Sequence, residues 1–149
     1  MIQHTTVQEV TLHYKRPKVT EMPKILCSQD AEKVMRSVID PNRIDLKEFF
    51  WVILMSRANQ VLGVSLIGEG TTNGTTVNIK EVFQLVITSN SSAVVLCHNH
   101  PSGQLKPSQA DISITEKIKR VAQILDVQVL DHLIISSEGC YSMCDDGKM

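Results

Sequence analysis

Two neighbouring apolar runs constrain the fold of this chain more than any other feature of its sequence. Residues 49–55 are seven consecutive apolar residues, and residues 61–67 form a second apolar-rich run. Both runs are rich in the β-branched and aromatic residues that suit a sheet. The pattern therefore predicts a β-hairpin with its turn at residues 56–60. Seven apolar residues are also far fewer than the roughly 20 that a membrane-spanning helix needs, so we expect no membrane span.

Further strands are predicted along the rest of the chain. Residues 93–97 form a continuous apolar run, which is typical of a central strand that is buried on both faces. Residues 127–136 and 140–143 are predicted to be two more strands on either side of a turn at Gly139. Near the N-terminus, alternating apolar residues at positions 10, 12 and 14 predict a first strand on a weaker pattern.

Three helices are predicted from capping residues and apolar stripes. Ser28 precedes a stripe with helical spacing, and we expect it to cap a helix that ends before Pro41. Asn78 and Ser108 each stand three residues before an acidic residue, which is the spacing of a capping box. The residues expected to face the core are Ala31, Val34, Met35, Val38 and Ile39 in the first helix, Val82, Leu85 and Val86 in the second, and Ile114, Ile118, Val121 and Leu125 in the third.

These elements predict a fold class. Strands and helices are mixed along the whole chain, with hairpin and crossover connections, which indicates an α/β (α+β) fold with a mixed β-sheet flanked by helices. A length of 149 residues, with 42% apolar and 21% charged residues, fits one soluble globular domain with a substantial core. We expect residues 1–25 to contain the first strand and an irregular connector that holds four Lys or Arg residues.

Charge and cysteine content exclude some classes of function. The net charge of -1 provides no general attraction to nucleic acid or to an anionic membrane. The N-terminus lacks the apolar segment of a signal peptide, so we expect a cytoplasmic location. Cys27, Cys97, Cys140 and Cys144 form no C-x-x-C pair and are predicted to be reduced thiols, with Cys97 as a small buried apolar residue.

The most informative stretch is a candidate metal site. His98 and His100 stand two residues apart in an extended segment, so both imidazoles face one side while Asn99 faces the other. Residues 101–107 can return the chain so that Asp111, in the first turn of the next helix, becomes a third ligand. Two imidazole nitrogens and one carboxylate oxygen suit Zn²⁺, and three protein ligands leave a fourth position for water. We therefore predict one zinc ion per chain, bound by His98, His100 and Asp111.

Hydrolysis of an amide also needs a group that takes a proton from water and delivers it to the leaving amine. A carboxylate near the metal is the usual choice. Glu48, at the start of the strand predicted for residues 49–55, is the candidate. On position alone, the alternatives are Glu9, Glu21, Glu32 and Glu81.

The pattern of a glutamate, then H-x-H, seven residues, Ser, two residues and Asp resembles that of the JAMM/MPN metalloprotease superfamily. The longer strings HNHPSG at residues 98–103 and PSQAD at residues 107–111, with DHLII at residues 131–135, resemble one branch of it, the bacterial RadC-like proteins. The similarity implies a RadC-like JAB/MPN metalloprotease domain over residues 26–149. It also implies a sheet flanked by helices in a JAMM/MPN fold, similar to that of the cytidine deaminases.

This resemblance implies a role for each residue of the pattern. His98, His100 and Asp111 would be the zinc ligands, and Glu48 would be the general acid and base. Ser108 would donate a hydrogen bond to the tetrahedral oxyanion. The implied activity is that of a zinc metallopeptidase, a JAMM-type hydrolase of peptide or isopeptide bonds, so the expected partner is a peptide or protein substrate.

Two departures from the family pattern leave the substrate open. Longer RadC-like proteins carry a glycine-containing helix-hairpin-helix module that approaches DNA, and we expect that module to be absent because no glycine precedes Gly63. Peptidases that process ubiquitin-like modifiers carry Ser or Thr in place of Asn99. Two alternatives stay open. One is a DNA-repair-associated or DNA-binding protein without hydrolase activity, which the net charge does not support. The other is a non-catalytic domain with structural zinc.

We expect Asp131 and His132 to be structural, with a hydrogen bond near the site.

Overall fold

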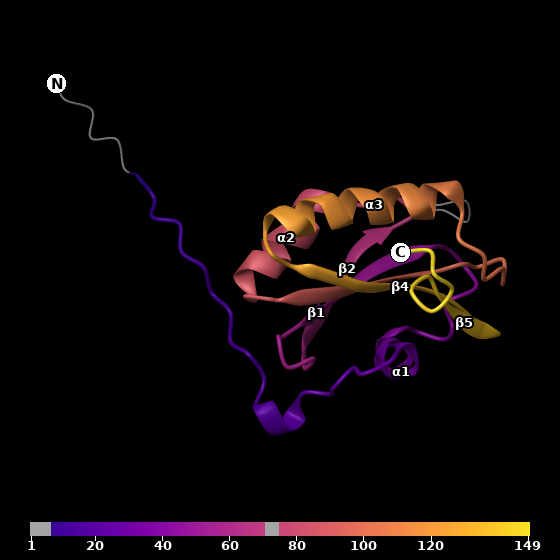
Figure 1. Ribbon diagram of the computed structural model, residues 1–149, viewed down its shortest axis with the longest axis horizontal. Helices are drawn as coiled ribbons and strands as arrows, with labels where there is room; N and C mark the ends of the chain where they lie inside the picture. The colour runs from indigo at the N-terminus through magenta and orange to yellow at the C-terminus, as the bar shows by residue number, and fades with distance from the viewer. Residues whose placement is uncertain (1–6, 71–74) are drawn as a thin grey trace.

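The structure of the protein is a computed structural model, which describes residues 7–70 and 75–149. Its centre is a five-stranded sheet with the strand order β2-β1-β3-β4-β5 (Figure 1). The pair β3–β4 is parallel, and the other three neighbouring pairs are antiparallel. The sheet is therefore mixed, as predicted, and β1–β2 is the predicted hairpin. The strands are β1 (Phe49–Met55), β2 (Val61–Glu69), β3 (Ala93–Asn99), β4 (Gln128–Ser136) and β5 (Gly139–Ser142).

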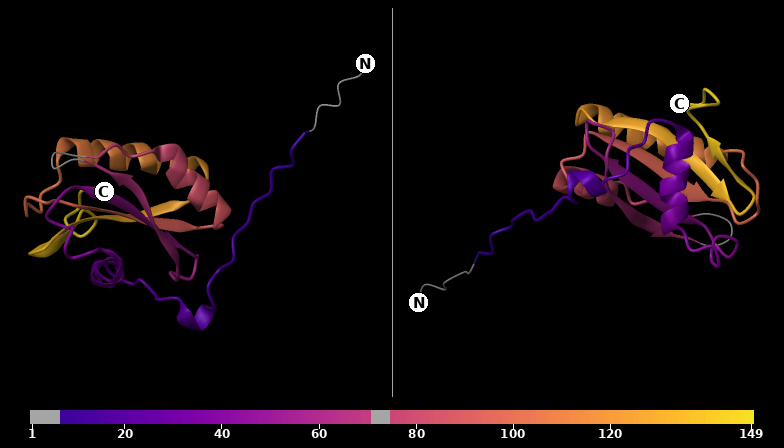
Figure 2. Two further views of the ribbon diagram at one scale, coloured as in Figure 1. Left: turned by 180° about the vertical axis from the view of Figure 1, so that it is seen from behind. Right: turned by 90° about the horizontal axis from the view of Figure 1, so that it is seen from below.

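Helices cover both faces of this sheet. Helix α1 (Ser28–Val38) lies on one face, while α2 (Ile79–Thr88) and α3 (Gln109–Ile124) lie on the other (Figures 1 and 2). A single turn of 3-10 helix, η1 (Val19–Glu21), precedes α1. Alternate side chains of β1 and β3 pack into the core under α1 or into the core under α2 and α3. Every residue of these two strands is consequently buried, which confirms the prediction of a central strand at residues 93–97.

The capping residues behave largely as predicted. Asn78 Oδ1 accepts a hydrogen bond from the Glu81 N–H at 3.3 Å, and Ser108 opens α3 with a full capping box. The prediction for the first helix is wrong by one residue, because Cys27 is the N-cap and Ser28 is already helical. The N–H groups of Asp30 and Ala31, which a Ser28 cap would bind, donate to the carbonyl of Cys27 instead, at 3.2 and 3.3 Å. The carboxylate of Asp30 accepts the N–H of Leu26 at 3.0 Å.

The strand predicted at residues 10–14 is wrong. Residues 7–18 form no strand, Val10 is 91% exposed and Leu12 is 69% exposed, and the segment extends away from the domain (Figure 2). Alternation cannot make a strand by itself, because its backbone groups need a neighbouring strand as a partner. The hydroxyl of Tyr14 does contact the sheet, where it donates to the carbonyl of Leu62 at 3.0 Å. Residues 1–6 of the predicted N-terminal segment lie outside the described residues.

Two helix positions predicted to face the core are exposed instead. Val38, the last residue of α1, is 49% exposed, and Leu125, the C-cap of α3, is 40% exposed, whereas Ile39 of the first predicted stripe is buried. The buried row of α3 is Asp111, Thr115, Ile118 and Ala122, and Ile114 and Val121 pack at its margin. This row begins with two polar residues, which places them inside the protein at the N-terminal end of α3.

The cysteines match the prediction of free thiols. All four lie within the described residues and are unpaired, and Cys97 is fully buried. Burial raises the pKa of the Cys97 thiol well above its ordinary value. No helix within residues 7–70 and 75–149 is both long and apolar enough to cross a membrane.

Candidate metal centre

Three side chains with metal-ligating atoms meet where β3 ends and α3 begins. His98 is the next-to-last residue of β3, His100 follows the strand, and Asp111 lies in the first turn of α3. The Nε2 atom of His98 lies 2.9 Å from Nε2 of His100 and 3.2 Å from Oδ1 of Asp111. The Nε2 atom of His100 lies 3.5 Å from Oδ2 of Asp111. The structure thus brings the three predicted ligands together, and this largely buried cluster could hold a metal ion.

The geometry and the proton positions of this cluster both fit a metal ion. Two zinc ligands with bonds of about 2.1 Å at a tetrahedral angle stand roughly 3.4 Å apart, and the three separations above lie on either side of that value. The Nδ1 of His100 lies 2.7 Å from the carbonyl oxygen of Gln104, which can only accept, so Nδ1 carries the proton. In its neutral form His100 therefore presents the lone pair of Nε2 to the cluster, where a cation would be stabilised.

The capping box of α3 fixes the third ligand. The Ser108 N–H donates to Oδ2 of Asp111 at 2.6 Å, and the Asp111 N–H donates to Oγ of Ser108 at 3.1 Å. Burial by itself would raise the pKa of Asp111, but its contacts with His100, His98 and Ser108 outweigh burial and hold this pKa well below the ordinary value. Asp111 is therefore a carboxylate. Because Oγ of Ser108 accepts from Asp111, the hydroxyl proton of Ser108 is available to another acceptor.

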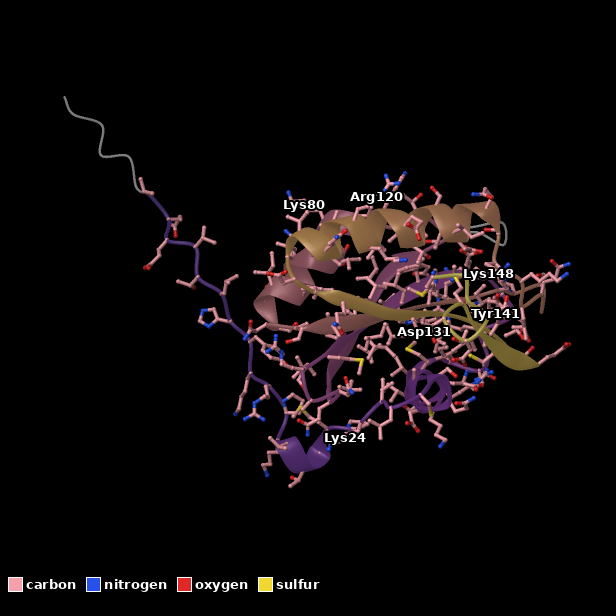
Figure 3. The ribbon with its side chains drawn as sticks, in the orientation of Figure 1. Lys24, Lys80, Arg120, Asp131, Tyr141 and Lys148 are labelled. Carbon is pink, nitrogen blue, oxygen red and sulfur yellow. The ribbon has the colours of Figure 1, made fainter. Side chains whose placement is uncertain are left out.

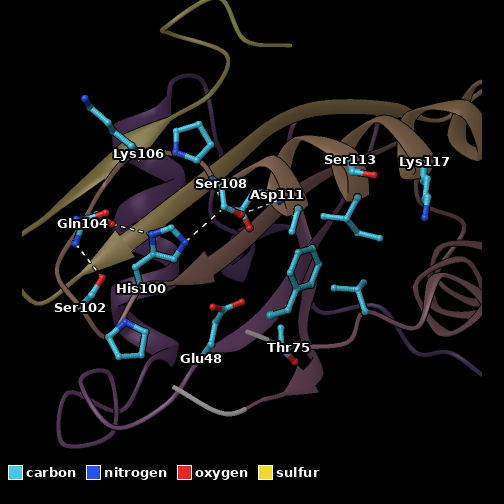
Figure 4. A pocket seen from close by; sticks show the side chains of 16 residues that line it. Glu48, Thr75, His100, Ser102, Gln104, Lys106, Ser108, Asp111, Ser113 and Lys117 are labelled. Atoms are coloured by element: carbon cyan, nitrogen blue, oxygen red, sulfur yellow. Dashed lines mark hydrogen bonds and ion pairs between the residues drawn. The ribbon is translucent and has the colours of Figure 1, made fainter. Parts of the chain in front are cut away.

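A cavity of about 570 Å³ opens over the cluster (Figure 4). His100 and Asp111 line it together with Glu48 and Ser108, the two residues predicted to act in catalysis. Figure 4 shows the carboxylate of Glu48 pointing across the cavity toward His100 and Asp111. The alternative glutamates Glu9, Glu21, Glu32 and Glu81 are not among its lining residues.

Burial of Glu48 makes it suitable for proton transfer. Burial raises the pKa of Glu48 above its ordinary value, against the opposing charges of His98 and His100, and the charge of Asp111 adds to the rise. A carboxyl group with a raised pKa exchanges protons closer to neutral pH than an exposed glutamate does. The position and the electrostatics of Glu48 therefore suit the role predicted for it.

Sequence reasoning missed the role of Asn99, which fixes the segment that carries Glu48. Asn99 is fully buried, and its Oδ1 accepts the N–H of Phe49 at 2.7 Å. Its Nδ2 donates to the carbonyls of Ile44 and Lys47 at 2.7 and 2.9 Å. A polar residue at the end of an apolar strand was the available signal, because a buried amide needs several partners. Asn99 therefore connects the histidine strand to the residues on either side of Glu48.

The two residues expected to be structural have separate environments. The Nε2 of His132 lies 2.8 Å from Nδ1 of His98, and Nδ1 of His132 lies 2.6 Å from Oγ1 of Thr115, a residue that sequence reasoning did not single out. Asp131 instead faces the C-terminal segment (Figure 3), where it accepts from the hydroxyl of Ser142 at 2.6 Å and from the N–H of Cys144 at 3.0 Å. His132 therefore contacts the site, and Asp131 organises the C-terminal turn.

Comparison with protein families agrees with the arrangement of this site. The family model of the RadC-like JAB domain matches residues 25–148. The chain belongs to the RadC-like JAB domain family. This membership accords with the mixed sheet and three helices, which are consistent with a JAB/MPN fold.

Proteins of several bacteria are similar in sequence to this RadC-like protein. A UPF0758 protein of Flavobacterium johnsoniae is 41% identical over 131 residues, which cover 87% of this chain and 55% of the relative. A UPF0758 protein of Pelodictyon phaeoclathratiforme is 33% identical over 138 residues, which cover 93% of this chain and 60% of the relative. The chain therefore spans little more than half the length of these curated relatives. Their names state no activity.

Proposed function

We propose that this RadC-like protein is a zinc-dependent hydrolase of JAMM type that cleaves peptide or isopeptide bonds. One observation carries the proposal. The cavity places two imidazole nitrogens and a carboxylate beside a second, partly buried carboxyl group, that of Glu48, which is not needed to bind the metal. A purely structural metal site has no use for such a group, whereas hydrolysis of an amide requires one.

The proposed metal ligands are Nε2 of His98, Nε2 of His100 and the carboxylate of Asp111. Two nitrogens and one oxygen suit zinc, and three protein ligands leave one position open. Bound zinc would supply an activated water and would polarise the carbonyl group of the substrate. Two of these ligands, His100 and Asp111, line the cavity, so a substrate can reach this position from solvent.

Glu48 would move the proton. In its ionised form the carboxylate takes a proton from the attacking water, and it then delivers this proton to the amine that leaves. The raised pKa of Glu48 makes its carboxylate a stronger base for the first of these steps. The segment held by Asn99 keeps the carboxylate aimed into the cavity.

Ser108 would stabilise the negative charge that develops on the carbonyl oxygen of the substrate. Its Oγ is already held by the Asp111 N–H, so the hydroxyl group is positioned before a substrate binds. Lys106 and Lys117 also line the cavity and provide positive charge to a bound substrate. The cavity therefore combines a proton carrier and a hydrogen-bond donor around the metal ligands.

Metal stoichiometry tests the first half of the proposal. Elemental analysis of tag-free protein should find about one zinc per chain, and His98→Ala and Asp111→Ala should each lose it while staying folded. His13→Ala and Asp45→Ala are matched controls, because both residues are exposed and lie outside the cavity. Wild-type protein that stays free of metal after zinc is supplied would refute the proposal.

Hydrolysis tests the second half. Zinc-loaded protein is incubated with peptides and with isopeptide-linked conjugates, and Glu48→Gln serves as the comparison. We expect Glu48→Gln to keep its zinc and to lose hydrolysis by at least about 100-fold, the contribution typical of general acid and base catalysis. If Glu48→Gln matches the wild type while Asp111→Ala unfolds the protein, the zinc is structural.

A second candidate function, DNA binding, has one observation in its favour. Lys15, Arg16 and Lys18 of the N-terminal segment and Arg57 line a separate cavity of about 930 Å³. Such a group of cations can contact phosphates even on a protein of net charge -1. This candidate predicts salt-sensitive binding of duplex DNA, measured by fluorescence anisotropy, that survives Asp111→Ala and is lost in Arg57→Glu. Equal binding by Arg57→Glu would count against this surface.

A further inference from the structure

We propose that Thr115 and His132 are positioning residues that set the tautomer of His98, so that the Nε2 lone pair of His98 points at the metal site. The three side chains form a row of hydrogen bonds, called here the Thr115–His132–His98 relay, which begins at the backbone carbonyl of Asp111. The inference rests on the proposed metal site, and it assigns a function to a histidine and a threonine that do not touch the metal.

The direction of the relay is fixed at its first contact. Oγ1 of Thr115 lies 2.6 Å from the carbonyl oxygen of Asp111, one helical turn earlier. A carbonyl oxygen has no proton to give, so the Thr115 hydroxyl must donate. The sulfur of Met143, at 3.9 Å, is a weak competitor for the same proton. Thr115 has therefore used its single proton.

The second contact then has one possible direction. Oγ1 of Thr115 lies 2.6 Å from Nδ1 of His132 and has no proton left for it. The proton must sit on Nδ1 of His132, which donates to Thr115. A neutral imidazole carries one N–H, so Nε2 of His132 is an acceptor.

The third contact fixes which ring nitrogen of His98 carries a proton. Nε2 of His132 lies 2.8 Å from Nδ1 of His98. Because Nε2 of His132 accepts, Nδ1 of His98 carries a proton, and neutral His98 then has a lone pair on Nε2, the atom that faces His100 and Asp111. Outer hydrogen bonds of this kind fix the tautomer and the orientation of metal-binding histidines.

Burial keeps the relay in one arrangement. Thr115 and His98 are each 1% exposed and His132 is fully buried, so water has little access to offer other partners. The ring of Phe50 stacks on His98 with 6.2 Å between ring centres, and it meets His132 edge-on at 5.6 Å. Because the relay starts at the carbonyl of Asp111, it also connects two proposed ligands, His98 and Asp111, through the interior.

Thr115→Val tests the relay with little change of shape, since it replaces the hydroxyl by a methyl group. His132 then loses the acceptor for Nδ1–H, which favours its other tautomer and transfers the proton of His98 to Nε2. We expect the affinity for Zn²⁺ alone, measured by competition with a chromophoric chelator, to fall roughly 10- to 100-fold. Thr115→Ser is the matched control and should stay within about three-fold of the wild type, because it keeps the hydroxyl.

A spectroscopic measurement separates this inference from the proposed function. Two-bond ¹⁵N–¹H correlation spectra of the metal-free protein report which ring nitrogen of each histidine carries a proton. The relay requires Nδ1–H on His98 and on His132 in the wild type and in Thr115→Ser, with a change in Thr115→Val. A missing Nδ1–H signal from either histidine, or an Nε2–H signal from His132, in the wild type would overturn the inference, whether or not the protein binds zinc. Unchanged zinc affinity in folded Thr115→Val would overturn it as well.

Discussion

Replacement of Asn99 by alanine should weaken the domain at the segment that holds Glu48. The change removes three buried hydrogen bonds, one from the Phe49 N–H and two to the carbonyls of Ile44 and Lys47. At about 1 kcal/mol for each net hydrogen bond, Asn99→Ala should lower the free energy of unfolding by about 3 kcal/mol. For a domain of this size, that loss corresponds to a fall in Tm of roughly 6–12 °C.

The protein contains its own probe for this measurement. Trp51 is the single tryptophan, and it lies buried in β1, two residues from Phe49. Urea unfolding followed by Trp51 fluorescence provides the stability difference, and exchange of the Phe49 amide hydrogen reports the loss of its acceptor. Asn42→Ala, at an exposed asparagine, is the matched control and should stay within about 0.5 kcal/mol of the wild type.

Asn99→Asp refines the test. It keeps the acceptor for the Phe49 N–H but places a carboxylate oxygen against the carbonyls of Ile44 and Lys47, so it should also be destabilising. The reasoning would be refuted if Asn99→Ala lost less than about 1 kcal/mol. It would equally be refuted if the Phe49 amide exchanged as slowly in Asn99→Ala as in the wild type.

Other predictions follow from burial and from one perturbed pKa. Met35→Ala should lower the free energy of unfolding by about 2–5 kcal/mol, because Met35 is fully buried on the side of α1 that faces the core, and a loss below 1 kcal/mol would contradict this core. Val10→Ser should change the free energy of unfolding by less than about 0.5 kcal/mol, since Val10 is 91% exposed. A larger loss of stability would mean that residue 10 is packed against the domain. Burial, with a hydrogen bond to Asp146, raises the pKa of Tyr141 to about 12. Because the unfolded side chain ionises near pH 10, stability should fall as the pH rises from 10 to 12, and Tyr141→Phe should remove that part of the fall. Phenolate absorbance follows the titration, and ionisation of both tyrosines near pH 10 would contradict the raised value.

Much of the proposed metal site could be predicted from the sequence because its parts are close in the chain. His98 and His100 share one face of an extended segment by the geometry of a strand alone. Ser108 and Asp111 form a capping box, which depends on a single turn of helix. These relations need no knowledge of the rest of the protein.

The same local patterns explain where prediction failed. The residues at positions 10, 12 and 14 alternate as a strand would, yet they form none, because a strand also needs a neighbour and the described structure offers none there. The helical stripes of α1 and α3 are correct in the middle of each helix and wrong at Val38 and Leu125, where the helix ends. Periodicity predicts the face of an element, while its length is decided by what the element packs against.

The sequence by itself determined the hairpin, the central strand, the helix starts at Asn78 and Ser108, and the set of candidate ligands. The tertiary structure decided which glutamate faces the ligands, which residue holds its segment, and which buried side chains surround His98. Asn99 reaches Phe49 across 50 residues, and His98 reaches His132 across 34. Contacts over such separations depend on strand order and on the packing of α3 over the sheet, and no local spacing in the chain encodes them.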